Sequence, residues 1–192
     1  MRVFIAVLVL IFSLQSWTKA DDIRDFEIEG MSIGDSLLDY MTVEEIKRLK
    51  KFDYSGKYKG IVLDEVNFTQ YDDMQLAYKN NNKYIIHSLA GRIHFNKKKL
   101  SECLSLRKKI ELDLSKTFNN ADIKRKEKQK HNYDKSGNSL TYATWYKLKD
   151  GSSANIVCFD WSKKIEKSIT DKLMITVSSS EFNSYLDNEA YK

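Results

Sequence analysis

The pattern of apolar and polar residues along the chain predicts helices followed by antiparallel strands, and this order occurs once in each half of the chain. Apolar residues recur every three or four positions, as on one face of a helix, in 35–51, 97–117 and 180–186. They alternate with polar residues, as in half-buried strands, in 61–68, 74–78, 84–95, 140–148, 154–161 and 173–177. Turn residues such as Asp150 and Gly151 connect neighbouring strands, which favours antiparallel pairing.

The order of these elements predicts an α+β fold, in which an antiparallel sheet meander carries helices packed on one face. A length of 172 residues after residue 20 suits a single domain, 21–192. Each half, 21–96 and 97–192, begins with helical spacing and continues as strands. The domain can therefore be described as a possible pseudo-duplication of a module containing a helix and three strands.

The most specific local pattern in the chain is a capping box at Thr42 and Glu45. In such a box the two side chains bond to each other's backbone amides at the start of a helix. Met41 and Ile46 stand where a hydrophobic staple would hold the same turn. A short helix is therefore expected to begin after Thr42 and to run to about Lys51.

Residues 1–20 have the pattern of a secretory signal peptide. Arg2 precedes an unbroken apolar run over 3–12, and the small residue Ala20 comes before two aspartates. A spanning helix needs about 20 apolar residues, so a retained membrane anchor is the less favoured alternative. The sequence predicts an exported protein, periplasmic or extracellular after cleavage near Ala20, with membrane contact only through the cleaved segment.

Two cysteines, Cys103 and Cys158, would then reach an oxidising compartment, where a disulfide is the favoured interpretation. Cys103 lies on the apolar side of the helix predicted over 97–117, and Cys158 shares a strand face with Ala154 and Ile156. Both sulfur atoms are therefore expected to point into the core. Two buried free thiols, or a single reactive cysteine, are the alternatives.

Net charge and motif content exclude several classes of function. After residue 20 the chain carries 30 basic and 27 acidic side chains, a net charge of +3. Nucleic-acid binding needs a stronger basic patch, so nucleic acid is not an expected partner. No catalytic serine, zinc-protease or phosphate-loop motif is present. His87 and His94 are expected on opposite strand faces, so no metal site and no cofactor are predicted.

The segment 29–36, Glu-Gly-Met-Ser-Ile-Gly-Asp-Ser, leads directly into the predicted helices and strands. It resembles the opening of two kinds of small envelope protein, the small lipoprotein subunit of the β-barrel assembly machinery and the tandem β-lactamase-inhibitory proteins. Modules of both families begin with two helices followed by three antiparallel strands. The chain has no cysteine near Ala20, so the resemblance does not extend to a lipid anchor. What it implies is protein binding on the sheet face rather than catalysis.

A run of basic residues covers 124–131 and has two interpretations. It can attract an anionic lipid or polyanion, or it can protect the edge of a sheet from unwanted pairing. Glu127 and Gln129 interrupt the run and weaken its field. The edge-strand interpretation is therefore favoured.

One predicted hairpin concentrates aromatic residues and is the only candidate binding site in the sequence. Its members are Tyr142, Trp145, Tyr146, Phe159 and Trp161. Tyr142 and Tyr146 share one strand face, and Trp145 takes the other. Aromatic rings exposed on a sheet are candidates for contact with a protein or glycan, whereas rings covered by a helix would be core.

Two hypotheses of different classes follow from these patterns. The first is a non-catalytic protein-interaction module whose partner is another envelope protein, and it is favoured because no catalytic spacing is present. The second is a small hydrolase or ligand-binding domain whose site is scattered in sequence. The first predicts an exposed sheet face, and the second predicts a pocket with converging ionisable groups.

Overall fold

A computed structural model describes residues 22–64, 66–81, 83–95 and 99–190, and the predicted signal peptide lies outside these residues. The helices are α1 (Val43–Arg48), α2 (Leu100–Thr117) and α3 (Ser180–Asn188), with short 3-10 turns at Ile23–Asp25, Leu37–Asp39 and Ile165–Lys167. A small hairpin pairs β1 (Glu27–Ile28) with β2 (Met31–Ser32). The main sheet contains β3 (Lys50–Tyr54), β4 (Tyr58–Leu63), β5 (Asp73–Lys79), β6 (Ile86–Phe95), β7 (Asp122–Lys130), β8 (Leu140–Lys147), β9 (Ser153–Asp160) and β10 (Asp171–Ser178).

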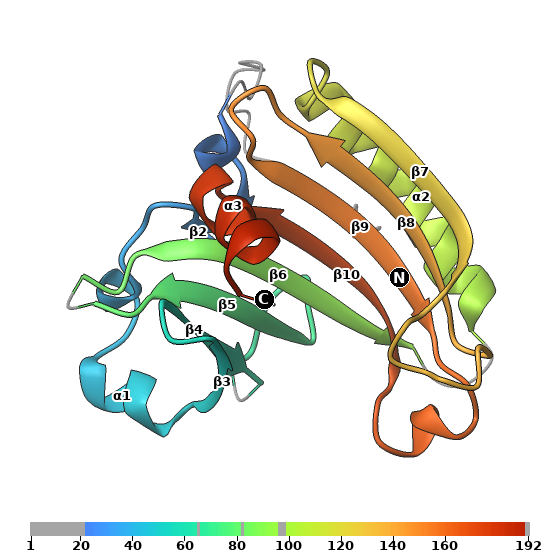
Figure 1. Cartoon of the computed structure of the whole chain (residues 1–192), viewed down its shortest axis with the longest axis horizontal. Helices are drawn as coiled ribbons and strands as arrows, with labels where there is room; N and C mark the ends of the chain where they lie inside the picture. Colours follow the sequence, from blue (N-terminus) through green and yellow to red (C-terminus); the bar gives the residue numbers. More distant parts are fainter. Residues whose placement is uncertain (1–21, 65, 82, 96–98, 191–192) are drawn as a thin grey trace, which may run out of the picture.

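The main sheet is antiparallel throughout, with the strand order β3-β4-β5-β6-β10-β9-β8-β7, which confirms the predicted α+β meander. Each half contributes one four-stranded meander, and the two meanders meet where β6 pairs with β10 (Figure 1). The prediction of three strands in the first half missed β3, whereas the fourth strand of the second half, β7, is formed by the basic run that was expected at a sheet edge. The predicted helix end at Lys51 was also wrong, because α1 ends at Arg48 and Lys50 begins β3.

The capping box at the start of α1 is present as predicted. The Thr42 hydroxyl accepts a bond from the Glu45 amide at 3.3 Å, and the Glu45 carboxylate accepts one from the Thr42 amide at 2.7 Å. Ile46 in this helix is fully buried against the sheet. The cap therefore fixes where the chain turns from the N-terminal segment into the first meander.

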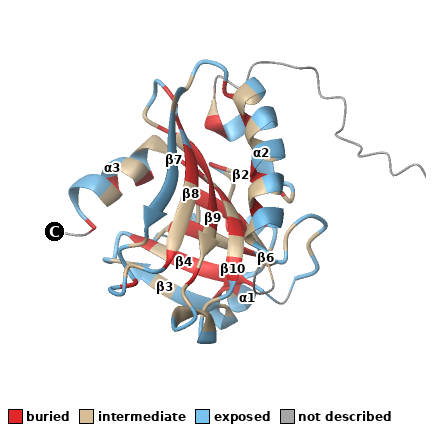
Figure 2. Ribbon diagram, turned by 90° about the vertical axis from the view of Figure 1, so that its right-hand side faces the viewer, coloured by how far each residue is buried: buried red, intermediate tan, exposed pale blue. Residues whose placement is uncertain are grey.

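The two faces of the main sheet are covered differently, and Figure 2 shows α2 and α3 on opposite sides of it. The face under α2, here called the α2 face, carries the main hydrophobic cluster, including Leu89, Ile156 and Ile175. The other face, here called the α3 face, carries a smaller cluster in which Phe182 and Tyr185 of α3 pack against β4 and β5. The prediction had placed all helices on one face.

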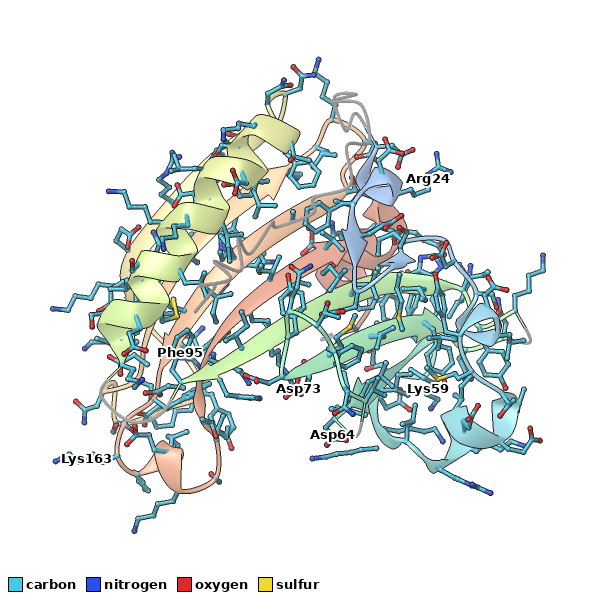
Figure 3. All side chains as sticks on the ribbon, turned by 180° about the vertical axis from the view of Figure 1, so that it is seen from behind. Arg24, Lys59, Asp64, Asp73, Phe95 and Lys163 are labelled. Carbon is cyan, nitrogen blue, oxygen red and sulfur yellow. A yellow bond between two sulfur atoms is a disulfide. The ribbon has the colours of Figure 1, made fainter. Side chains whose placement is uncertain are left out.

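A disulfide joins α2 to the sheet beneath it, as predicted. Cys103 and Cys158 are bonded, with their Cα atoms 6.1 Å apart and 55 residues between them in sequence. Both residues are buried in the main cluster, and Figure 3 shows α2 lying across the strands on this side. Bridges of this kind are typical of proteins exported to oxidising compartments.

The basic run forms β7, which is an edge strand of the sheet. Its pairing with β8 shifts register between Lys126 and Gln129, and Lys128 adopts a positive φ of 53°. Irregular, lysine-rich edges resist pairing with other chains, so the edge-strand interpretation is confirmed. The sequence analysis missed that Arg107 of α2 is buried and pairs with Glu127 on this strand, at 3.1 Å from Nη1.

The segment 29–36 that carries the resemblance contributes to the core of the first half. It forms the turn and second strand of the β1–β2 hairpin, and Met31 and Ile33 are buried in the main cluster. Ser36 then caps the 3-10 turn that follows, accepting a hydrogen bond from the Leu38 amide at 3.2 Å. This segment packs on the α2 face, so it closes that face and leaves the other one free.

Candidate functional site

The five aromatic residues of the predicted site are divided among three places. Tyr142 and Tyr146 lie on the α2 face, where both pack against the main cluster. Tyr146 has no exposed surface, and its hydroxyl donates to the Glu111 carbonyl at 3.1 Å. These two tyrosines are covered by α2 and belong to the core rather than to a surface.

Phe159 and Trp161 form a second group at the far end of the α3 face. Their rings stack at 5.6 Å with an angle of 15°, and the His131 ring lies 4.7 Å from Trp161. Trp161 retains only 7% of its surface. The Lys172 ammonium lies 5.6 Å from the centre of the Phe159 ring. Only the edge of this group borders the open sheet face.

Trp145 is the most exposed member of the predicted site, with 42% of its surface accessible. It lies on the α3 face as expected, opposite Lys124 of β7 and Asn155 of β9. It lines a groove, here called the α3 groove, between α3 and strands β7 to β9. The groove has a volume of about 880 Å³.

The strand wall of the α3 groove carries three lysines together with Asp122 and Asp150, and the helix wall is polar and acidic. Lys124 and Lys126 on β7 and Lys147 on β8 line the first wall. Ser184 and Asp187 of α3 contribute to the second wall. Lys124 lies 3.6 Å from Asp122, in an exposed pair. Lys126 and Lys147 have no ion-pair partner among the described residues.

The position of α3 over the sheet is fixed by packing and by hydrogen bonds. Phe182 contacts the Tyr58 ring edge-on, with ring centres 5.0 Å apart. Asn183 donates from its amide nitrogen to the Gly151 carbonyl at 2.9 Å and to Ser153 at 3.0 Å. Gly151 occupies the β8–β9 turn with a φ of 89°, where glycine is favoured. The helix wall of the groove is thus held against the hairpin that carries Trp145.

Beyond α3, the sheet surface has no second layer among the described residues. Four small or medium apolar side chains on the α3 face, Val62, Ala90, Ala143 and Val157, are shielded by their neighbours but belong to neither core cluster. Figure 1 views this face and shows α3 as the helix over it. The α3 groove therefore continues into an open sheet surface.

The end of this open surface next to Phe159 carries charged side chains. The Arg92 guanidinium pairs with Asp73, and His94 lies 2.6 Å from the same carboxylate. Lys172 is adjacent, opposite His94 in the β6–β10 pair. Burial lowers the pKa of Lys172, and the neighbouring charge of Arg92 lowers it further. These groups lie next to Phe159, at the opposite end of the strands from the α3 groove.

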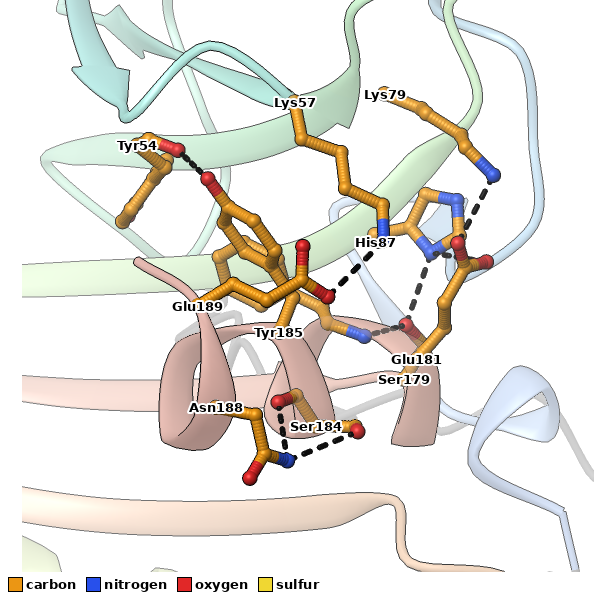
Figure 4. A network of polar contacts seen from close by, with 11 residues as sticks. Tyr54, Lys57, Lys79, His87, Ser179, Glu181, Ser184, Tyr185, Asn188 and Glu189 are labelled. Carbon is orange, nitrogen blue, oxygen red and sulfur yellow. Dashed lines mark hydrogen bonds and ion pairs between the residues drawn. The ribbon is translucent and has the colours of Figure 1, made fainter. Parts of the chain in front are cut away.

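A network of polar side chains ties the start and end of α3 to the first meander (Figure 4). Lys79 pairs with Glu181 at 2.9 Å, and Lys57 pairs with Glu189 at 3.5 Å. The hydrogen bond from Lys79 lowers the pKa of Glu181. His87 Nδ1 lies 2.9 Å from the Ser179 hydroxyl. A bulge between β5 and β6 turns His87 towards α3, so it shares a sheet face with His94, contrary to the prediction.

Ser179, His87 and Glu181 bring a hydroxyl, an imidazole and a carboxylate together, which are the three groups of a serine-hydrolase triad. A catalytic triad uses one ring nitrogen for the hydroxyl and the other for the carboxylate. Here both the Ser179 oxygen and the Glu181 carboxylate, at 3.9 Å, approach Nδ1. The Ser179 hydroxyl also accepts the Phe182 amide as the helix cap. The three side chains are therefore arranged as a helix cap and not as a catalytic triad.

Folding stability should fall as the pH falls below the ordinary pKa of histidine, near 6.5, and His87 should contribute to that loss. Burial lowers the pKa of His87, with Glu181 opposing the shift and Lys79 adding to it. The unfolded chain therefore binds the proton first, so stability present above pH 6.5 is lost as the pH falls towards the folded-state pKa. Urea unfolding at pH 7.5 and pH 5.5 measures this loss.

In that experiment the His87→Asn variant should lose less stability between the two pH values than the natural protein. Burial also lowers the pKa of His131. Part of the pH dependence of folding stability should therefore remain until His131 is replaced as well. An unchanged pH dependence in His87→Asn would show that this histidine is not the group that titrates.

Trp145→Ala should lower the free energy of unfolding by only about 1 kcal/mol, because the side chain lies outside both clusters although more than half of its surface is covered by neighbours. Thermal unfolding followed by circular dichroism measures the change. A loss above about 2 kcal/mol would mean that Trp145 supports the fold, and the variant could then not be used to test binding.

Within the described residues no helix is long and apolar enough to cross a membrane, and no cluster of three or more His, Cys, Asp or Glu side chains is placed to hold a metal ion. Comparison of the chain with protein-family models, with curated proteins and with solved structures finds no match. The resemblance of segment 29–36 to small envelope proteins therefore stays a prediction.

Proposed function

We propose that this chain is an exported, non-catalytic protein-interaction module that binds a partner protein through its α3 face. The supporting observation is the exposed Trp145 in the α3 groove, next to a sheet surface on which the described residues form no second layer. Exposed aromatic rings that line a groove are typical of protein contacts. The predicted export, to the periplasm or outside the cell after cleavage near Ala20, belongs to the same proposal.

The architecture suits such a role because rigid elements hold the proposed surface. The disulfide and the main cluster stabilise the α2 face, and this leaves the opposite face of the same strands available. Binding by a preformed surface costs less ordering entropy than binding by a flexible one. The partner is therefore expected to dock without a large rearrangement of the sheet.

Affinity capture with the protein produced from the full chain tests this proposal, using extract from the compartment to which it is exported. One stoichiometric protein should be retained by the natural protein and lost with Trp145→Ala. The matched control is Leu112→Ala, which removes a side chain that is 60% exposed on α2, on the other side of the sheet. Capture that survives Trp145→Ala but fails with Leu112→Ala would refute the proposed face.

Trp161 is unsuited to this test. Its side chain is buried against Phe159 and His131, so removing it would disturb packing as well as any contact. A loss of capture in a Trp161 variant would not separate binding from folding. Trp145 is the informative position because its removal leaves both clusters intact.

A further inference from the structure

We propose that the α3 groove binds an extended acidic segment of the partner protein, with carboxylates at alternate positions facing Lys124, Lys126 and Lys147. This inference rests on the proposed function, since it names the partner's chemistry at the same surface. It is carried by the spacing and the accessibility of the three ammonium groups, and by the absence of an ion-pair partner for Lys126 and Lys147 among the described residues.

The spacing of the lysines matches that of a β-strand. Lys124 and Lys126 are two residues apart on β7, so they point to the same face of the sheet, where such neighbours stand about 6.8 Å apart. Residues i and i+2 of an extended ligand repeat at the same distance. Carboxylates at every second position can therefore meet successive lysines without bending the ligand.

The charges on the strand wall are not neutralised within the described part of the protein. Lys126 and Lys147 have no ion-pair partner there, and the Lys124–Asp122 pair is exposed at 3.6 Å. Of the four acids that line the groove, Asp122 pairs with Lys124, Glu181 pairs with Lys79, and Asp150 accepts two bonds from Ser152, whereas Asp187 lies on the helix wall. Asp122 also lies opposite Lys147 in the β7–β8 pair. An acidic ligand would supply the missing partners on this wall.

The helix wall explains why acidic and non-acidic residues should alternate along the ligand. Asp187 of α3 faces the groove together with Ser184, so carboxylates pointing to this side would be repelled. Side chains at the intervening positions of an extended segment point to the opposite side. These positions should therefore be neutral or basic, and Trp145 offers an apolar surface to the ligand between the two walls.

The shape of the site favours a protein segment over a flat anionic membrane. Figure 2 shows α3 standing out from the sheet on the side of the groove. A planar bilayer that approached this face would meet α3 before it reached Lys147 on β8. A narrow, extended chain can enter between the helix and the strands.

The test is a titration of the isotope-labelled full-chain product with a short synthetic peptide in which glutamate and threonine alternate. Amide shifts of β7, β8 and α3 should change, and those of α2 should not. Peptides with glutamine or lysine in place of glutamate should have little effect at low salt. Raising the salt concentration should weaken binding, because exposed ion pairs are screened.

Variants of the lysines provide the decisive comparison. Lys126→Gln combined with Lys147→Gln should weaken peptide binding roughly fivefold, as expected for two exposed ion pairs. Lys108→Gln combined with Lys109→Gln on α2 is the matched control, because it removes the same charge from the other side of the sheet and should leave affinity unchanged.

Three results would overturn the proposal. Equal binding of the glutamine peptide would show that charge is not recognised, although the groove would still bind a protein segment. Stronger effects of phosphatidylglycerol vesicles on the same amides would identify a lipid ligand instead. No shift with any peptide would reject the acidic segment, and affinity capture with Trp145→Ala would still decide the proposed function independently.

Discussion

Replacing both cysteines with alanine should lower the free energy of unfolding by about 4 kcal/mol. The bridge closes a loop of 55 residues that contains most of α2 and all of β7 and β8. In the chain-entropy model, opening a loop of this length increases the conformational entropy of the unfolded chain and lowers its free energy by about 4 kcal/mol. Both side chains are buried, so alanine is preferred to serine, which would place a hydroxyl in the core.

Urea unfolding of the natural protein and of the Cys103→Ala, Cys158→Ala double variant measures this loss. Reduction of the natural protein with dithiothreitol serves as the control, because it opens the same loop without changing the sequence. The reduced protein and the variant should agree within about 1 kcal/mol. A loss below about 1 kcal/mol would mean that α2 is held by packing alone.

Phe182→Ala should lower the free energy of unfolding by about 3 to 5 kcal/mol, which is the usual cost of removing a buried phenylalanine. Phe182 is 2% exposed and contacts the rings of Tyr54 and Tyr58 edge-on, at 5.1 and 5.0 Å. The second cluster is small, so it has few other side chains to hold α3 on the sheet. The loss should therefore fall mainly on α3 and on the groove.

Hydrogen exchange locates the effect of this change. Amides of α3 should exchange much faster in Phe182→Ala, and those of β9 and β10 should keep most of their protection. Phe182→Leu is the matched control, since it retains most of the volume and should cost less than about 1.5 kcal/mol. Uniformly faster exchange across the sheet would contradict the view that α3 rests on a separate cluster.

Much of the fold was predictable because its signals are local. The capping box at Thr42 was confirmed, and so was the pairing of Cys103 with Cys158. The basic run was recognised as an edge strand from its charge. The strand β3 was missed because Lys50 and Lys51 continue the polar face of the preceding helix, and only pairing with β4 makes them extended.

The candidate site was less predictable because it depends on which helix covers which face. Alternation along β8 correctly separated Trp145 from Tyr142 and Tyr146, but it could not say that α2 covers the two tyrosines. The groove itself arises from packing of Phe182 and Tyr185 on β4 and β5, more than 100 residues away in sequence. The bulge that turns His87 towards α3 likewise leaves no mark in the sequence pattern.

The two faces of the sheet have separate roles in this account. The α2 face is closed by α2, the disulfide and segment 29–36, and it stabilises the domain. The α3 face carries an exposed tryptophan, a groove, and two lysines, Lys126 and Lys147, that have no ion-pair partner in the described part of the chain. The proposed partner binds there without competing with the contacts that hold the fold together.

Photocrosslinking from the groove shows whether the partner binds on the α3 face. A photoreactive amino acid would replace Ser184, which is exposed on α3 and lines the groove, and in a second protein it would replace Leu112 on α2. In extract from the compartment in which the proposal places the protein, the Ser184 position should yield one dominant crosslinked protein. The Leu112 position should not. A dominant crosslink from Leu112, with none from Ser184, would contradict the account.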